Sequence, residues 1–151
     1  MSRRTIAVVG ASLSGLRAAQ QLRAQGYDDD LVIIGAEQHL PYYRPPLSKE
    51  YLLGTMGADD LALAEQSDID ELDARWLLGV AAERLDVTGG RIVLASGEEI
   101  AADGVVIATG GVPRRLPAAD GLLGVHVLRS LDDADALRAE LTGGAQNVVV
   151  I

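Results

Sequence analysis

The chain has 151 residues, about the size of one domain, and is too short for two catalytic domains. Thirteen Lys and Arg against 22 Asp and Glu give a net charge of −9, which argues against a nucleic-acid partner because a phosphate backbone would be repelled. The sequence has no cysteine, which excludes disulfides, thiolate metal sites and cysteine redox pairs from these residues, so redox chemistry here would need a bound cofactor.

The first third of the chain has the order strand, glycine-rich turn, helix, strand. Residues 5–9 and 31–34 are short apolar runs rich in branched side chains, which is typical of buried parallel strands. Between them, residues 14–25 carry apolar side chains at helical spacing, and Gly26 follows where a helix would end. This order predicts a βαβ unit.

A proline-rich loop and an acidic stretch come next. Three prolines within residues 40–50 exclude a central strand and make this loop stiff. We expect Ser48 to cap a short helix that runs to about Leu53. The acidic residues between Asp59 and Asp73 indicate helical turns and solvated loop.

Short strands then replace the helical pattern. The segments 75–78, 81–87, 91–95 and 98–101, separated by glycine-containing turns, predict an antiparallel meander. The buried run 104–108 is expected to rejoin the parallel sheet. The fold class is therefore α/β, a Rossmann-like domain with a parallel sheet and an inserted antiparallel β-meander.

The last part of the sequence predicts a helix, a linker and a strand. Ser130, followed by two aspartates, is expected to cap a helix that ends at Leu141. We assign residues 1–141 to one domain and 142–151 to a linker and the first strand of a second, truncated domain. An apolar strand at the last residues has no helix to lead into, so we expect the chain to be a fragment.

The turn Gly10-Ala-Ser-Leu-Ser-Gly15 has the spacing of a dinucleotide fingerprint, with Ser12 in place of the middle glycine. The helix that follows would offer free backbone N–H groups to a pyrophosphate. Glu37, just beyond the second strand, is a candidate for the adenosine ribose hydroxyls. A ligand-free turn and a surface glutamate are the alternatives.

Four stretches resemble a known family: Gly10-x-Ser-x-x-Gly15, Pro41-Tyr-Tyr-Arg-Pro-Pro-Leu-Ser-Lys49, Ala108-Thr-Gly-Gly-Val-Pro-Arg-Arg-Leu-Pro117 and Leu128-Arg-Ser-Leu-Asp-Asp-Ala134. They are similar to the FAD-binding part of NAD(P)H-dependent ferredoxin reductases, the group that includes putidaredoxin, rubredoxin and dioxygenase reductases, within the pyridine nucleotide-disulfide oxidoreductase superfamily. The resemblance covers essentially the whole chain.

For the adenosine half of FAD, the resemblance implies that Glu37 holds the ribose and that Ala82 meets the adenine through its backbone. It assigns the pyrophosphate to Gly10, Ser12, Ser14 and Gly15.

For the flavin half, the resemblance implies that Arg44 and Lys49 approach the ring system, with Lys49 beside the isoalloxazine as the catalytic candidate. It also implies that Thr109 and Gly110 close over the cofactor and that Arg129 reaches it from a distant loop. Fixed cations in such places would stabilise phosphate and the negative charge of a reduced flavin.

The function that the resemblance implies is an FAD oxidoreductase that takes hydride from NAD(P)H and passes electrons to a ferredoxin-type iron–sulfur protein. NAD(P)H would bind to residues beyond Ile151, and this fragment alone would be inactive. The alternatives are a truncated nucleotide-binding or interaction module without turnover, or another FAD enzyme such as a rubredoxin reductase or a flavin monooxygenase.

We expect no membrane partner and a cytoplasmic location, because the apolar runs are too short for a bilayer span and no signal peptide is recognisable. Self-association through the last strand is a further expectation, since an uncovered strand edge can recruit another strand.

Overall fold

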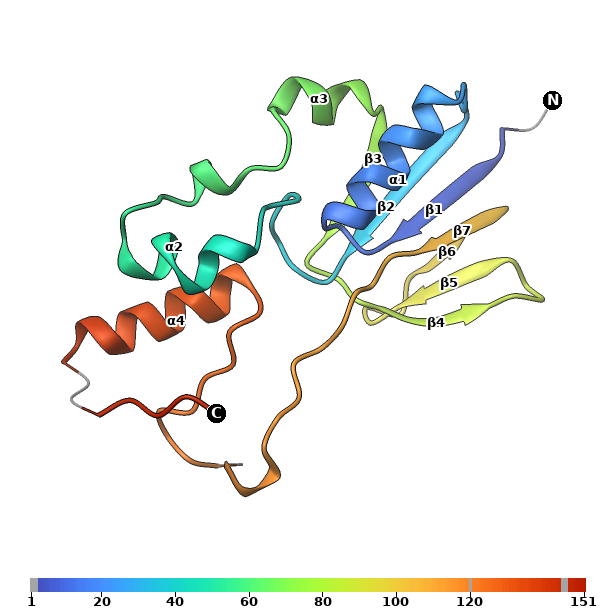
Figure 1. Cartoon of the computed structure of the whole chain (residues 1–151). Helices are drawn as coiled ribbons and strands as arrows, with labels where there is room; N and C mark the ends of the chain where they lie inside the picture. Colours follow the sequence, from blue (N-terminus) through green and yellow to red (C-terminus); the bar gives the residue numbers. More distant parts are fainter. Residues whose placement is uncertain (1–2, 120, 145–146) are drawn as a thin grey trace. The chain divides into compact units, whose positions relative to one another are not determined.

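A computed structural model describes residues 3–119, 121–144 and 147–151 (Figure 1). The chain divides into two compact units. Unit 1 consists of Met1–Tyr42 and Ala62–Gly110, and unit 2 consists of Tyr43–Leu61 and Gly111–Ile151. None of the helices in the described ranges is long and apolar enough to span a bilayer.

Unit 1 is built on a parallel sheet with the strand order β3-β2-β1-β7. The strands are β1 (Thr5–Val9), β2 (Asp30–Gly35), β3 (Ala74–Leu78) and β7 (Gly104–Ile107), and the helices α1 (Leu13–Ala24) and α3 (Gln66–Glu71) lie between them in the chain. The predicted βαβ unit and the return of residues 104–108 to this sheet are confirmed. Because the strands are parallel, their carboxyl ends share one edge.

Both faces of the parallel sheet are buried, and alternate residues of each strand serve opposite faces. On β2, Leu31 and Ile33 face the helices, and Val32 and Ile34 face the second sheet. The helical face forms one cluster of buried residues: Val8, Leu16, Ala19, Leu31, Ile33, Ile69 and Leu72. The other face forms a second cluster: Ala7, Val9, Val32, Ile34, Ile92, Leu94 and Ile100. These aliphatic residues fill a core that contains no phenylalanine.

The second sheet is antiparallel, in the order β4-β5-β6. Its strands are β4 (Ala82–Asp86), β5 (Arg91–Leu94) and β6 (Glu99–Ala101). The predicted meander was one strand too long, because β3 pairs parallel with β2 and belongs to the first sheet. The preceding acidic stretch contains α3, whose Ile69 is buried against the sheet, so this stretch is a crossover connection that delivers β3 parallel to β2.

Unit 2 contains short helical segments and one longer helix. The segments are η1 (Pro45–Ser48), α2 (Glu50–Leu53), η2 (Asp59–Leu61), η3 (Pro117–Ala119) and α4 (Leu131–Thr142). The prediction that Ser48 caps the short helix was wrong: Ser48 ends η1, and Lys49 is the N-cap of α2. Two prolines at the start of η1 fix a tight turn there, and the chain changes direction only at Lys49, whose φ is −133° and ψ is −109°.

The predicted cap of α4 is confirmed. The hydroxyl of Ser130 accepts the N–H of Asp133 at 3.1 Å, and the Asp133 carboxylate accepts the N–H of Ser130 at 2.8 Å and that of Arg129 at 3.0 Å. Burial raises the pKa of Asp133, but these hydrogen bonds and the charge of Arg115 outweigh burial and leave that pKa lowered. The carboxylate therefore stays charged where the helix dipole favours an anion.

Residues 147–151 have no strand assignment, although the sequence predicted a strand there. The side chains of Val149, Val150 and Ile151 are 86%, 91% and 100% exposed. A strand is defined by its hydrogen bonds to a neighbour, and within the described ranges none joins this segment to a strand. Ala145 and Gln146 of the predicted linker lie outside the described residues. The domain boundary and self-association through this segment remain predictions.

Arg23 holds the connection between α1, β2 and α3. Its guanidinium lies 5.7 Å from the centre of the Tyr27 ring and donates to four backbone carbonyl oxygens. The acceptors are Tyr27 at 2.5 Å, Asp29 at 2.9 Å, Leu72 at 2.8 Å and Asp73 at 2.9 Å. Arg23 thereby satisfies carbonyls of two loops that no strand or helix pairs.

We expect Arg23→Met to lower the free energy of unfolding by about 1 to 3 kcal/mol, because it leaves partly buried acceptors unsatisfied. Urea unfolding measures this change. Arg17→Met on the same helix is the control: Arg17 bonds Gln20 at an exposed position, so its loss should cost less than about 0.5 kcal/mol. Equal costs for the two variants would contradict the structural role of Arg23.

Tyr51 joins α2 to α4 within unit 2. It is 5% exposed, its hydroxyl donates to the Asp135 carboxylate at 2.6 Å, and the Arg138 guanidinium lies 5.9 Å from its ring centre. Burial, followed by the hydrogen bond to Asp135 and the charge of Asp135, raises the pKa of Tyr51 to about 12. The folded chain therefore holds this proton more tightly than the unfolded chain does.

The stabilisation from Tyr51 should be complete below pH 10, the ordinary tyrosine pKa, and should be lost as the pH rises toward 12. The difference in unfolding free energy between wild type and Tyr51→Phe should therefore shrink over this interval, by on the order of 2 kcal/mol. Urea unfolding across alkaline pH measures it. A difference for Tyr51→Phe that stays flat between pH 10 and 12 would rule out the proton linkage.

Candidate functional site

The strand order marks one place on unit 1 as a binding crevice. In open parallel sheets, ligands bind at the carboxyl edge where the chain order reverses. Here β1 lies between β2 and β7, so the reversal falls between β1 and β7. The glycine-rich turn that follows β1, and the start of α1, occupy this part of the carboxyl edge.

Gly10 is required by the close approach of two backbone segments. Its N–H donates to the Ile34 carbonyl at 2.8 Å, and the Ala108 N–H donates to the Val9 carbonyl at 2.7 Å. Gly10 has φ of +121°, and a Cβ on it would lie 2.0 Å from the Ala108 carbonyl oxygen. Any side chain would therefore push the turn away from the end of β7.

Gly15 is needed for the same turn to meet its own helix, because a Cβ there would lie 1.8 Å from the Gly10 carbonyl oxygen. Ser12 is the N-cap, with extended backbone, and its carbonyl accepts the Leu16 N–H at 2.9 Å. The first turn of α1 reads Leu13-Ser14-Gly15, and Ser14 is exposed. The first backbone N–H groups of α1 have no partner carbonyl within the helix, and they lie at the positive end of the helix dipole. This end of the helix is therefore suited to bind a phosphate group.

Glu37 lies two residues beyond the end of β2 and is half-buried. Its carboxylate accepts the Tyr42 hydroxyl at 2.5 Å, and its backbone carbonyl accepts the Gly79 N–H at 2.9 Å. The segment after Gly79 leads into β4, whose first residue is Ala82. Glu37, which follows β2, therefore lies beside the segment that connects β3 to β4 and leads to Ala82.

Thr109 and Gly110 follow β7 at the same edge, and both are exposed. The Thr109 nitrogen would lie 2.9 Å from a Cβ on Gly10, so this segment runs directly beside the glycine-rich turn. Unit 1 thus gathers at its carboxyl edge most of the residues singled out in the sequence: Gly10, Ser12, Ser14, Gly15, Glu37, Thr109 and Gly110.

Three of the residues singled out in the sequence, Arg44, Lys49 and Arg129, belong to unit 2, and two of them lie together. Arg44 donates through Nη1 to the Arg129 carbonyl at 2.9 Å. Both residues line a cleft of about 370 Å³ whose other walls are Pro45, Leu47, Ser48 and Leu128. Lys49 follows this segment, is exposed, and does not line the cleft. Its backbone is held by hydrogen bonds to the Pro46 carbonyl and from the Leu53 N–H, both at 2.9 Å.

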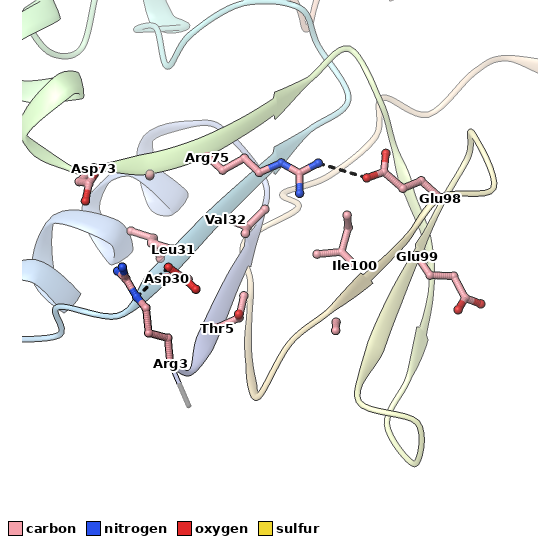
Figure 2. A pocket seen from close by; sticks show the side chains of 12 residues that line it. Arg3, Thr5, Asp30, Leu31, Val32, Asp73, Arg75, Glu98, Glu99 and Ile100 are labelled. Carbon is pink, nitrogen blue, oxygen red and sulfur yellow. Dashed lines mark hydrogen bonds and ion pairs between the residues drawn. The ribbon is translucent and has the colours of Figure 1, made fainter. Parts of the chain in front are cut away.

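A larger depression of about 570 Å³ lies at the opposite, amino-terminal end of the parallel strands (Figure 2). Two exposed ion pairs are part of its wall, Arg3 with Asp30 at 3.0 Å and Arg75 with Glu98 at 3.2 Å. It holds none of the residues singled out in the sequence. Within residues 3–119, 121–144 and 147–151, no group of histidine and acidic side chains is arranged to bind a metal ion.

Comparison with known proteins decides the family. The model of the family described as pyridine nucleotide-disulphide oxidoreductase matches residues 4–151. The chain belongs to the pyridine nucleotide-disulphide oxidoreductase family. The absence of cysteine means that these residues do not include a redox disulfide, whatever the family's name suggests. The resemblance recognised in the sequence is therefore confirmed.

Curated relatives from Pseudomonas putida match nearly the whole chain. The ferredoxin–NAD(+) reductase component of a p-cumate 2,3-dioxygenase system is 40% identical over 96% of this chain and 36% of its own length. Putidaredoxin reductase is 32% identical over 96% of this chain and 35% of its length. The chain thus spans about a third of the curated relatives it matches.

Solved structures of the family agree with the fold. In a covalent complex of putidaredoxin reductase and putidaredoxin, the matching chain gives a TM-score of 0.85 at 32% identity, over 93% of this chain and 35% of that chain. The NADH:rubredoxin oxidoreductase of Clostridium acetobutylicum gives 0.79 at 26% identity, over 95% of this chain and 36% of that chain. These matches confirm the α/β class with its parallel and antiparallel sheets.

Sequence reasoning missed Tyr42, the partner of Glu37. It adjoins Pro41 in the Pro-Tyr-Tyr-Arg stretch, which drew attention only for its prolines and cations. The sequence shows only a tyrosine five residues after a candidate carboxylate, and that spacing alone does not predict a hydrogen bond between them.

The glycine-rich turn can be tested with two alanine substitutions. We expect Gly26→Ala to cost about 1 to 2 kcal/mol, from its φ of +83° alone, because a Cβ there meets nothing within 4 Å. Gly10→Ala should cost about 1 to 3 kcal/mol more, since the backbone must shift to relieve the collision with Ala108. Urea unfolding compares the two, and equal costs would contradict the close contact between the turn and β7.

Proposed function

We propose that this chain binds FAD as part of an oxidoreductase that takes hydride from NAD(P)H and passes electrons to a ferredoxin-type iron–sulfur protein. The proposal rests on the arrangement of groups at the carboxyl edge of unit 1. There the open end of α1 lies at the reversal point of the sheet and a carboxylate follows the next strand. An anion at the helix and a diol at the carboxylate are the complementary groups, and the adenosine diphosphate half of FAD carries both.

In this proposal, the N–H groups at the start of α1 and the hydroxyls of Ser12 and Ser14 hold the pyrophosphate. Gly10 and Gly15 keep the turn close enough to the sheet for that approach. Glu37 accepts the ribose hydroxyls, the backbone of Ala82 meets the adenine, and Thr109 and Gly110 cover the cofactor. A carboxylate at the ribose would disfavour a phosphorylated ribose, which suits FAD.

In unit 2, the proposal gives the cations Arg44, Lys49 and Arg129 to the flavin half. When bound, FAD supplies the hydride acceptor and releases electrons singly. The task of the protein is then to orient the ring and to stabilise negative charge on it with fixed cations. Lys49 is the only lysine in the sequence, and its backbone is held between η1 and α2 by hydrogen bonds with Pro46 and Leu53.

The nicotinamide nucleotide and the electron acceptor are proposed from the relatives of this chain and not from its own residues. The relatives' names include ferredoxin–NAD(+) reductase, and one solved relative is joined to putidaredoxin. Since the chain spans about a third of these proteins, we assign NAD(P)H to a further domain outside these 151 residues.

Glu37→Ala tests the ribose contact. It should weaken FAD binding by about 1.5 to 3 kcal/mol, the range for a hydrogen bond that involves a charged group. Titration of the chain with FAD, followed by flavin fluorescence, measures the dissociation constant. Glu98→Ala, in the depression at the other end of the sheet, is the matched control and should change nothing. An unaltered constant for Glu37→Ala would return Glu37 to a surface role.

Lys49→Met tests the role given to the lysine. At an effective dielectric constant of 20, a charge ~4 Å from the ring contributes about 4 kcal/mol before screening. Even a quarter of that would shift a two-electron midpoint potential by about 20 mV to more negative values. Spectroelectrochemical titration of the FAD-loaded chain measures it, with Arg84→Met, an exposed cation of β4, as control. A fixed potential with a lowered melting temperature would make Lys49 a structural residue.

A further inference from the structure

The backbone of Glu37 is fixed by the strand ends around it. Its carbonyl accepts the Gly79 N–H at 2.9 Å, and the Gly35 carbonyl accepts the Val80 N–H at 3.0 Å. The turn after β3 is thus hydrogen-bonded to Gly35 and to Glu37, the residues before and after Ala36. A glutamate side chain still has three rotatable bonds beyond a fixed backbone, so its carboxylate needs a further restraint to occupy one place.

Tyr42 supplies that restraint. Its hydroxyl donates a hydrogen bond to Oε2 of Glu37 at 2.5 Å. Tyr42 is only 7% exposed, and the His39 ring meets it edge-on with ring centres 6.0 Å apart. The phenol therefore reaches the carboxylate from a buried ring with little freedom to move.

The backbone of Tyr42 is restrained as well. It forms an isolated antiparallel bridge with Ala62, and the Leu63 N–H donates to the Pro41 carbonyl at 3.1 Å. Pro41 has a fixed φ, which limits the approach to Tyr42. The chain departs from unit 1 after Tyr42 and returns at Ala62, so this bridge closes the loop between them at its base.

We propose that Tyr42 is a positioning residue that holds the Glu37 carboxylate in the orientation that accepts the ribose hydroxyls of an adenine nucleotide. This inference rests on the proposed function of the carboxyl edge and adds how the Glu37 carboxylate is held in place before the ligand binds. A carboxylate that is already ordered before binding loses less side-chain entropy when the ligand arrives. The ligand therefore binds more tightly than it would to a mobile carboxylate. Tyr42 acts only through Glu37.

A double-mutant cycle tests this, with FAD and ADP as the probes. Tyr42→Phe deletes one oxygen and keeps the ring, and it should weaken FAD and ADP by the same factor, about 5- to 10-fold. ADP contains the ribose and the pyrophosphate without the flavin, so equal effects locate the loss in the adenosine half. In the Glu37→Ala background, Tyr42→Phe should change either dissociation constant by less than about twofold.

Two further variants separate positioning from folding. Tyr43→Phe, at the neighbouring exposed tyrosine, should leave both dissociation constants unchanged. Glu37→Asp keeps the charge but moves it one methylene away from the Tyr42 hydroxyl, so it should weaken the binding of both FAD and ADP. In that background, Tyr42→Phe should leave both dissociation constants unchanged. Urea unfolding of each variant reports stability independently of binding.

The outcomes distinguish the inference from the function beneath it. If Glu37→Ala weakens both ligands while Tyr42→Phe does not, the positioning role is overturned and the ribose contact stands. If Tyr42→Phe weakens binding equally with and without Glu37, it acts through the fold and the inference is also overturned. If the wild-type chain binds neither FAD nor ADP, the proposed function fails and the inference fails with it.

Discussion

The close contact between the turn at Gly10 and the end of β7 is the constraint on which the rest of unit 1 depends. It joins the end of β1, the start of α1 and the end of β7 at the point where the chain order of the sheet reverses. Because backbone meets backbone there, only glycine can occupy position 10. The same contact points the open end of α1 along the carboxyl edge, so a packing requirement also creates the electrostatic site.

This constraint changes the meaning of the glycine motif. The usual argument is that the glycines make room for a pyrophosphate. In this chain, the space that a Cβ would need at Gly10 and Gly15 is already taken by Ala108 and by Gly10 itself. The glycines are therefore needed for the fold before any ligand binds, and the ligand-binding capacity follows from the helix position that they permit.

Much of unit 1 follows from local patterns in the sequence. The apolar runs that became β1, β2 and β7 are nearly continuous and rich in branched side chains, and the cap of α4 at Ser130 depends only on neighbouring residues. The errors have a common origin in long-range pairing. Whether β3 joins the parallel or the antiparallel sheet depends on the crossover through α3, which the acidic composition of that stretch concealed. Similarly, the apolar residues near Ile151 led to the prediction of a strand, but a strand forms only where its backbone can hydrogen-bond to a second strand.

The candidate site shows the same division. The positions of the glycine-rich turn and of Glu37 at the carboxyl edge could be predicted, because a motif and its flanking elements determine where they lie. Their role in binding remains a prediction. Tyr42 could not be, since its role depends on a hydrogen bond set by the bridge to Ala62. Arg44 and Arg129 are 85 positions apart, and only the fold of unit 2 brings them into one cleft.

In the proposed function, the carboxyl edge of the parallel sheet binds the adenosine diphosphate half of a dinucleotide. Mapping backbone amide NMR shifts during titration with ADP tests it most directly. Binding at this edge should give the largest changes at residues 11–15 and at Glu37, with little change around Arg3, Arg75 and Glu98 at the other end of the strands. Shifts concentrated in that amino-terminal depression, or no shifts at all at millimolar ADP, would contradict it.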